Sequence, residues 1–150
     1  MPGRDLAIRM KEYEDVSRAY LTRRMPIILR VDGRAFHTFT KKVKCERPFD
    51  YLLIERMTLV ALKLCEEIQG TKIAYQQSDE ISLFLSTYDN LDTEPWFGGC
   101  LQKIASVAAS IATATFNWES PYSVPAYFDA RCFIVPHSEV TNYFIWRQQD

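Results

Sequence analysis

The sequence is poor in the residues that build nitrogen and sulfur metal sites. It contains two histidines and four cysteines, and no two cysteines form a CxxC pair. A zinc site would need an unusual ligand set, so we expect reduced thiols. No apolar run approaches the ~20 residues that span a bilayer, so no membrane partner is expected. The N-terminal segment also lacks the apolar stretch of a secretory signal, which favours a cytoplasmic protein.

The composition is otherwise typical of one globular domain. The 150 residues are 47% hydrophobic and 25% charged, which is enough to build a core. The net charge of -1 hides an asymmetry, because residues 1–50 hold 12 Lys and Arg against 7 Asp and Glu, whereas residues 51–150 hold 6 against 12. The basic first third indicates a surface that can face phosphates.

Hydrophobic periodicity predicts the order of helices and strands. Helical spacing predicts an N-terminal helix, a helix after Asp50 as N-cap, and a long Ala- and Ser-rich helix after Cys100. Strand patterns fall at residues 26–33, in a hairpin around Ser78 and Asp79, and at 126–136. After the first helix the order is β-α-β-β-α-β. This is the ferredoxin-like layout of an α+β fold, one antiparallel sheet with both helices on one face.

The end of the chain has a different character. Residues 137–150 show helical spacing but stop at Asp150 without a C-cap. We therefore expect the N-terminal part of a longer protein, with an N-terminal helix in residues 1–25, a catalytic domain in 26–136 and the start of a C-terminal helical region in 137–150.

Carboxylates fall where strands end. Side chains alternate along a strand, so Asp32 lies on the face opposite the predicted helices, and Glu80 lies on the same face of the neighbouring strand. Together with Asp79 in the hairpin bend, three carboxylates are expected to converge at one sheet edge, where they would raise one another's pKa unless a cation neutralised them. Mg²⁺ is the expected occupant, and two ions about 4 Å apart would form a clamp for phosphoryl transfer.

Two other interpretations stay open from the residues alone. Asp-Gly at residues 32–33 and Asp-Glu at 79–80 are each ordinary turn chemistry. The same topology also serves RNA-recognition modules, which stack bases on sheet aromatics. Their basic-Gly-aromatic-Gly-aromatic motif is missing from this sequence, which makes the binding module a minor alternative.

Four segments together resemble the tRNA-histidine guanylyltransferase superfamily, including its guanylyltransferase-like 3′-to-5′ RNA polymerases. They are RVDGRAFHTFT (30–40), AYQQSDEISL (74–83), YFDAR (127–131) and FIWRQQD (144–150). The resemblance runs through nearly the whole chain in order. It implies a catalytic domain like the palm of polymerases and nucleotidyl cyclases, in agreement with the predicted layout.

The resemblance implies a metal site at the sheet edge. Asp32 and Asp79 match the family's metal-binding carboxylates, and the main chain at Gly33 matches a carbonyl ligand. Glu80 matches an adjacent acid needed for activity, so Asp32, Asp79 and Glu80 are the expected catalytic residues.

The resemblance also implies a nucleotide site. The matching positions are the main-chain amides of Arg34, Ala35 and Phe36 for a triphosphate, the side chains of Ser78 and Lys103 for phosphate oxygens, and His37 and Asp50 near the base. For Lys103 the alternative is an ordinary exposed helix lysine, and for His37 a surface imidazole.

The implied reaction extends RNA at its 5′ end. The 3′-hydroxyl of an incoming nucleotide attacks an activated 5′ phosphate, with two Mg²⁺ ions and with GTP and ATP as substrates. The implied partner is tRNA, through guanylylation of histidine tRNA or repair of 5′-truncated tRNA, and a homo-oligomer is expected. A nucleotide cyclase, another palm nucleotidyltransferase and a non-catalytic RNA-binding palm are the alternatives.

Overall fold

The computed structural model describes residues 2–150. Its elements in chain order are α1 (Pro2–Val16), β1 (Ile27–Gly33), α2 (Phe36–Lys42), α3 (Tyr51–Glu67), β2 (Thr71–Gln77), β3 (Glu80–Leu85), the 3-10 turn η1 (Trp96–Gly99), α4 (Leu101–Asn117), β4 (Phe128–Ile134), the 3-10 turn η2 (His137–Glu139) and α5 (Val140–Gln148). None of the helices in this part of the chain is long and apolar enough to cross a membrane.

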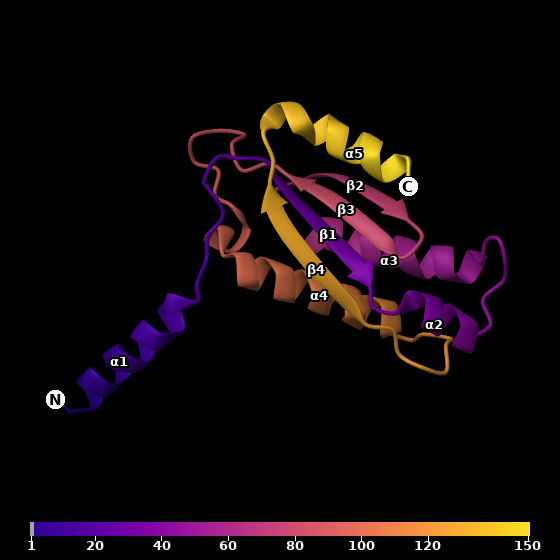
Figure 1. The fold of residues 1–150 in the computed structure, drawn as a ribbon, viewed down its shortest axis with the longest axis horizontal. Coiled ribbons are helices and arrows are strands. Elements are labelled where there is room, and N and C mark those ends of the chain that lie inside the picture. The colour runs from indigo at the N-terminus through magenta and orange to yellow at the C-terminus, as the bar shows by residue number, and fades with distance from the viewer. Residues whose placement is uncertain (1) are drawn as a thin grey trace.

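The sheet has four strands in the order β2-β3-β1-β4, and every neighbouring pair is antiparallel. The long helices α3 and α4 lie together on one side of it (Figure 1). This arrangement confirms the predicted α+β, ferredoxin-like layout. It makes β1 and β3 central neighbours, as expected from the strand order.

The core lies between the sheet and these two helices. Alternate residues of β1 and β3 point into it, and all are at most 2% exposed: Ile27, Leu29, Val31, Ile81, Leu83 and Leu85. Burying such aliphatic side chains contributes roughly 1.5–3 kcal/mol each. The helices supply the facing residues Met57, Val60, Leu64, Ile104, Ala108, Ala112 and Phe116. The small side chains of Ala108 and Ala112 let α4 lie close to the sheet.

Helix α2 was not predicted. It begins after Ala35, whose positive φ of 51° turns the chain out of β1. Phe36 and Phe39 lie one helical turn apart and are buried against Phe116. Seven residues are too few for a clear helical period in the sequence.

Helix α5 corrects the expectation of an open sheet face. It lies over the face opposite α3 and α4 (Figure 1). The Tyr143 hydroxyl is 2.8 Å from the Ser82 hydroxyl, and Ser82 is completely buried. The apolar positions of the last predicted helix therefore find a partner in the sheet itself.

Helix α1 extends away from the rest of the molecule (Figure 1). Its apolar side chains Leu6, Met10, Tyr13 and Val16 are all 45–86% exposed. The chain rejoins the fold at residues 19–21, where the Leu21 amide donates to the Gly99 carbonyl at 2.9 Å. The predicted division at residues 25 and 137 stays a prediction.

Candidate functional site

Three acids stand side by side at one edge of the sheet. In the strand register Asp32 of β1 lies opposite Glu80 of β3 on one side and opposite Asp129 of β4 on the other. Directly opposed residues share a face, with Cβ atoms roughly 4.5–5.5 Å apart. We call Glu80, Asp32 and Asp129 the acid row. Its side chains lie on the face that α5 covers in part, away from the core.

The hairpin bend brings a fourth carboxylate to the same edge. Ser78 has a positive φ of 53°, and the Gly33 amide donates to the Asp79 carbonyl at 3.0 Å. A Cβ at Gly33 would lie 2.9 Å from Oδ2 of Asp79 and 2.3 Å from the Phe36 ring. Only glycine fits between that ring and the carboxylate, so Gly33 permits the close approach of Asp79 to β1.

The electrostatics of this edge disfavour negative charge. Burial raises the pKa of Asp32, and Asp79, Glu80 and Asp129 raise it further, against a lowering by Arg30. Burial also raises the pKa of Asp79, while hydrogen bonds to its carboxylate oppose the shift. Carboxylates held under these conditions are stabilised by a bound cation.

The three predicted carboxylates meet at this edge, but Glu80 is paired with a cationic side chain. Glu80 is turned to Arg147 of α5, whose Nε and Nη2 each donate to one of its oxygens at 2.8 Å. Within residues 2–150 no three His, Cys, Asp or Glu side chains gather closely enough to hold a metal ion. The guanidinium of Arg147 already neutralises Glu80.

Asp32 and Asp79 nevertheless fit a hard divalent cation. Neither takes part in an ion pair among the described residues. Carboxylate and main-chain carbonyl oxygens are the donors that Mg²⁺ prefers, with water completing its shell. The two carboxylates at this edge are therefore suitable donors, and the Gly33 carbonyl stays a predicted ligand.

Of the three main-chain amides predicted to bind a triphosphate, one already donates a hydrogen bond within the protein. The Arg34 amide donates to the Tyr127 carbonyl at 2.8 Å, so it is not directed at a ligand in this structure. The amides of Ala35 and Phe36 make no main-chain hydrogen bond within residues 2–150. They stand where the chain turns from β1 into α2, directly after the acid row.

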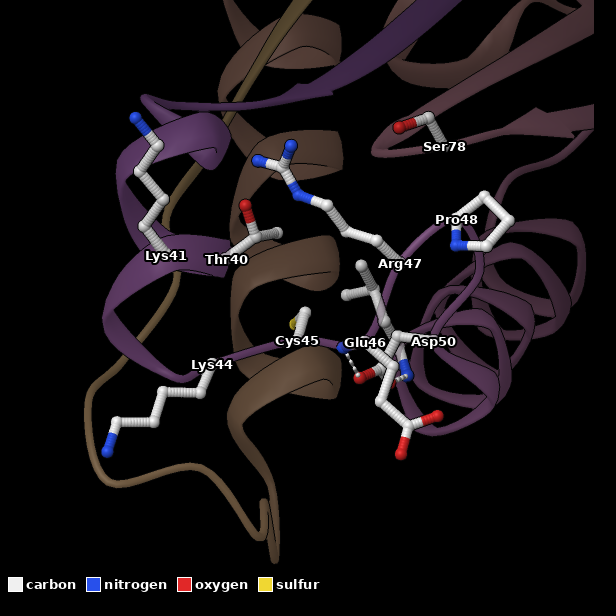
Figure 2. A pocket seen from close by; sticks show the side chains of 10 residues that line it. Thr40, Lys41, Lys44, Cys45, Glu46, Arg47, Pro48, Asp50 and Ser78 are labelled. Carbon is white, nitrogen blue, oxygen red and sulfur yellow. Dashed lines mark hydrogen bonds between the residues drawn. The ribbon is translucent and has the colours of Figure 1, made fainter.

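A cavity of about 340 Å³ opens beside the Ser78 bend. It lies between α2, the loop of residues 43–50 and the start of α3, and Figure 2 shows the Arg47 side chain reaching between Thr40 and Ser78. Lys41 and Lys44 also line it. Lys41, Lys44 and Arg47, which we call the cationic wall, thus line a cavity that also borders the turn carrying Asp79.

Asp50 lies on the wall of this cavity, but its oxygens are engaged. They accept from the amides of Leu53 at 2.8 Å and Glu46 at 2.9 Å, and these bonds lower the pKa of Asp50. The side chain caps α3 as the sequence predicted. Its predicted place near a base stays a prediction.

The two remaining predicted residues lie apart from each other. His37 is exposed on α2, next to Phe36. Lys103 is exposed near the start of α4, with Nζ 4.7 Å from the Phe97 ring centre. The amide of Phe128, which pairs with Gly33 across the β1–β4 ladder, donates a hydrogen bond to the hydroxyl of Thr113 in the same helix. Ten residues of helix separate Lys103 from that level by about 15 Å, so the structure does not bring Lys103 to the acid row of its own chain.

A family model described as tRNAHis guanylyltransferase (Thg1) matches residues 7–136. The chain belongs to the tRNAHis guanylyltransferase family. This confirms the resemblance seen in the four sequence segments, and it places the chain in a family of nucleotidyltransferases, as predicted.

Curated tRNAHis guanylyltransferases resemble the chain over most of its length. It is 36% identical over 132 residues to the probable tRNA(His) guanylyltransferase of Dictyostelium discoideum, which covers 83% of the chain and 50% of that protein. It is 32% identical over 148 residues to the enzyme of Schizosaccharomyces pombe, covering 94% of the chain and 54% of that protein. The chain thus spans about half the length of these relatives.

Solved guanylyltransferase structures share the fold. A bacterial tRNA(His) guanylyltransferase (Thg1)-like protein in complex with GTP is 49% identical with a TM-score of 0.93, over 97% of this chain and 70% of that one. The tRNA(His) guanylyltransferase from Saccharomyces cerevisiae is 26% identical with a TM-score of 0.72, over 87% of this chain and 60% of that one.

Sequence reasoning missed several charged residues of this guanylyltransferase-family site. Arg147 reaches Glu80 across 67 positions of sequence, and no local pattern signals such a pair. Asp129 was not among the expected site residues, and it forms an exposed ion pair with Arg131 at 3.6 Å. Arg47 lies in the basic first third of the chain, which was the one available signal for the cationic wall.

Proposed function

We propose that this chain is the palm part of a Mg²⁺-dependent nucleotidyltransferase that adds nucleotides in the 3′-to-5′ direction to the 5′ end of tRNA. The observation that carries the proposal is the 49% identity, at a TM-score of 0.93, to a bacterial Thg1-like protein in complex with GTP. A second match, to a complex with ATP, has 49% identity and a TM-score of 0.91. GTP and ATP are accordingly the proposed nucleotide substrates.

The sheet edge supplies the proposed catalytic oxygens. Asp32, Asp79 and the Gly33 carbonyl would hold Mg²⁺, two ions in the proposed mechanism. Bound there, Mg²⁺ lowers the pKa of an attacking hydroxyl and neutralises the leaving pyrophosphate. Burial and repulsion from neighbouring carboxylates, Glu80 among them, already raise the pKa values of both aspartates, which supports a cation at this place.

The surrounding residues position the nucleotide. The amides of Ala35 and Phe36 can donate to triphosphate oxygens at the end of β1, and the Ser78 hydroxyl lies in the adjoining turn. Arg47 brings positive charge into the cavity beside them (Figure 2). His37 and Asp50 are the proposed residues near the base.

The reaction balances without a protein nucleophile. The 3′-oxygen of the incoming nucleotide forms a bond to the activated 5′ phosphorus of the RNA, and the bond to pyrophosphate or AMP breaks. The hydroxyl proton leaves to solvent. Positioning and charge stabilisation are the main contributions that such phosphoryl transfer needs from a protein.

Within the family, we propose repair of 5′-truncated tRNA as the reaction. The support is the higher identity to the bacterial Thg1-like protein, 49%, than to the guanylyltransferases of Dictyostelium discoideum and Schizosaccharomyces pombe, 36% and 32%. Guanylylation of histidine tRNA is the second candidate, supported by the names of those relatives. The homo-oligomer and the cytoplasmic location stay predictions.

The test is an assay for nucleotide addition to the 5′ end of tRNA. A tRNA lacking its first nucleotide and carrying a 5′-triphosphate is incubated with the protein, Mg²⁺ and GTP labelled in the α-phosphate. We expect a product one nucleotide longer at its 5′ end, dependent on the opposing template base. Full-length histidine tRNA is the parallel substrate, and extension of it alone would favour guanylylation. A cyclic nucleotide product would identify a cyclase, and RNA binding without any product would identify a non-catalytic palm.

A further inference from the structure

One member of the acid row, Glu80, is held in an ion pair with Arg147 of α5. We propose that Arg147 is a positioning residue that neutralises Glu80 and thereby leaves Asp32 and Asp79 as the carboxylates facing the cation. The inference rests on the proposed function of this edge. It assigns α5 a role in setting the charge of the site.

The contact between Arg147 and Glu80 is bidentate and sheltered. Nε and Nη2 donate to Oε1 and Oε2 at 2.8 Å each, and the two side chains are only 11% and 13% exposed. The fork of a guanidinium matches a carboxylate in this geometry, which fixes orientation as well as charge. With both oxygens engaged in this way, Glu80 is poorly placed to bind a metal ion.

Further contacts hold Arg147 in that orientation. Its guanidinium lies 4.4 Å from the centre of the Trp146 ring, which favours a cation. Nη2 also donates to Oδ2 of Asp150 at 2.7 Å. Asp150 is 65% exposed, so its contribution is small compared with that of Glu80.

Helix α5 itself is fixed to the sheet close to this pair. Tyr143 is 7% exposed, and its hydroxyl pairs with the buried Ser82 hydroxyl two residues along β3 from Glu80. Its ring meets Phe133 of β4 at 5.9 Å. The place of Arg147 therefore follows from the packing of α5 and not from the ion pair alone.

The consequence for the site is electrostatic. Glu80 lies directly opposite Asp32, and its charge raises the pKa of both Asp32 and Asp79. An unpaired Glu80 would add one negative charge beside a cation held by the two aspartates. Paired with Arg147, it adds none, so the guanidinium lowers cation affinity while keeping the third carboxylate out of the coordination shell.

The experiment uses Mn²⁺ as the probe, with free Mn²⁺ measured by electron paramagnetic resonance, so that binding is read without activity. One charge beside a divalent ion predicts about tenfold tighter Mn²⁺ binding in Arg147→Met and about tenfold weaker binding in Glu80→Gln. The double variant should return to within about twofold of the wild type. Arg23→Met is the matched control, because it removes an exposed arginine paired with Glu94 away from the site.

The outcomes separate the inference from the proposed function. If Arg147 merely attaches α5 to the sheet, Arg147→Met and Glu80→Gln will both weaken Mn²⁺ binding or both leave it unchanged, and either result overturns the inference. Glu80→Gln keeps the size of the side chain and decides the matter if Arg147→Met does not fold. Failure of the wild type to bind Mn²⁺, with or without GTP, would overturn the proposed function and the inference with it.

Discussion

Asp32 and Glu80 lie directly opposite each other in the β1–β3 ladder, yet of the two only Glu80 has a cationic partner among the described residues. Two neighbouring carboxylates on one sheet face thus differ in their charge partners. Glu80 is neutralised by Arg147, while Asp32 keeps a raised pKa and no salt bridge. The difference makes Asp32 the better candidate for binding an external cation.

The first prediction concerns the close approach of Asp79 to β1. Gly33→Ala places a methyl group 2.3 Å from the Phe36 ring and 2.9 Å from the Asp79 carboxylate. Relieving such an overlap typically costs about 1–3 kcal/mol of unfolding free energy. Urea unfolding measures the loss, with Gly3→Ala as control because nothing lies within 4 Å of that position. Equal stability of the two variants would contradict the geometry.

The second prediction concerns pH. The folded-state pKa of Asp79 is raised, so the folded protein holds this proton to higher pH than the unfolded chain does. The associated stability is present below the ordinary Asp pKa of about 4 and is lost as pH rises through the folded value. Asp79→Asn should therefore be more stable than wild type at pH 7, and the two should converge in acid. Urea unfolding at both pH values tests this, and a less stable Asn variant at pH 7 would refute it.

The third prediction has the opposite sign. Two main-chain amides bond the Asp50 carboxylate and lower its pKa, so its contribution is present at neutral pH and fades as pH falls through that lowered value. Asp50→Ala should lose about 1 kcal/mol of unfolding free energy at pH 7. Asp50→Asn keeps an N-cap oxygen and should lose less. Thermal unfolding of both variants is the measurement, and equal losses would show that the cap is not the cause.

The fourth prediction concerns the cationic wall of the cavity. Arg47→Met should weaken GTP binding by about tenfold at low salt, and the difference should shrink as salt screens the charge. Isothermal titration calorimetry at two salt concentrations gives both numbers. Arg23→Met removes the same charge on an exposed segment outside the cavity and should bind GTP as the wild type does. A similar loss in both variants would indicate a general charge effect instead of a site.

The sequence predicts most of the sheet because strand periodicity is local. Ile27, Leu29 and Val31 take every second position, while the other face carries Ile28, Arg30 and Asp32, which is enough to assign the buried face and to place Asp32 on the other. Helix α2 escaped prediction because it is short and starts from the positive φ of Ala35, a conformation that glycine usually provides.

The features that the sequence does not reveal depend on distance along the chain. No local pattern reports that Arg147 will reach Glu80, because their contact depends on how α5 packs against the sheet. Lys103 is assigned to the nucleotide by resemblance alone, and that role stays a prediction. The rise of α4 places it about 15 Å from the level of Gly33, which motif spacing does not reveal.

The most direct test of the proposed site is Mg²⁺-dependent binding of GTP to the wild type and to Asp32→Asn. We expect saturable binding that disappears when Mg²⁺ is chelated and that falls at least tenfold in Asp32→Asn, a change that keeps the size of the side chain. Asp92→Asn, in an exposed loop, should bind as the wild type does. Binding that is independent of Mg²⁺, or that is equal in Asp32→Asn and wild type, would contradict the assignment of this sheet edge as the catalytic site.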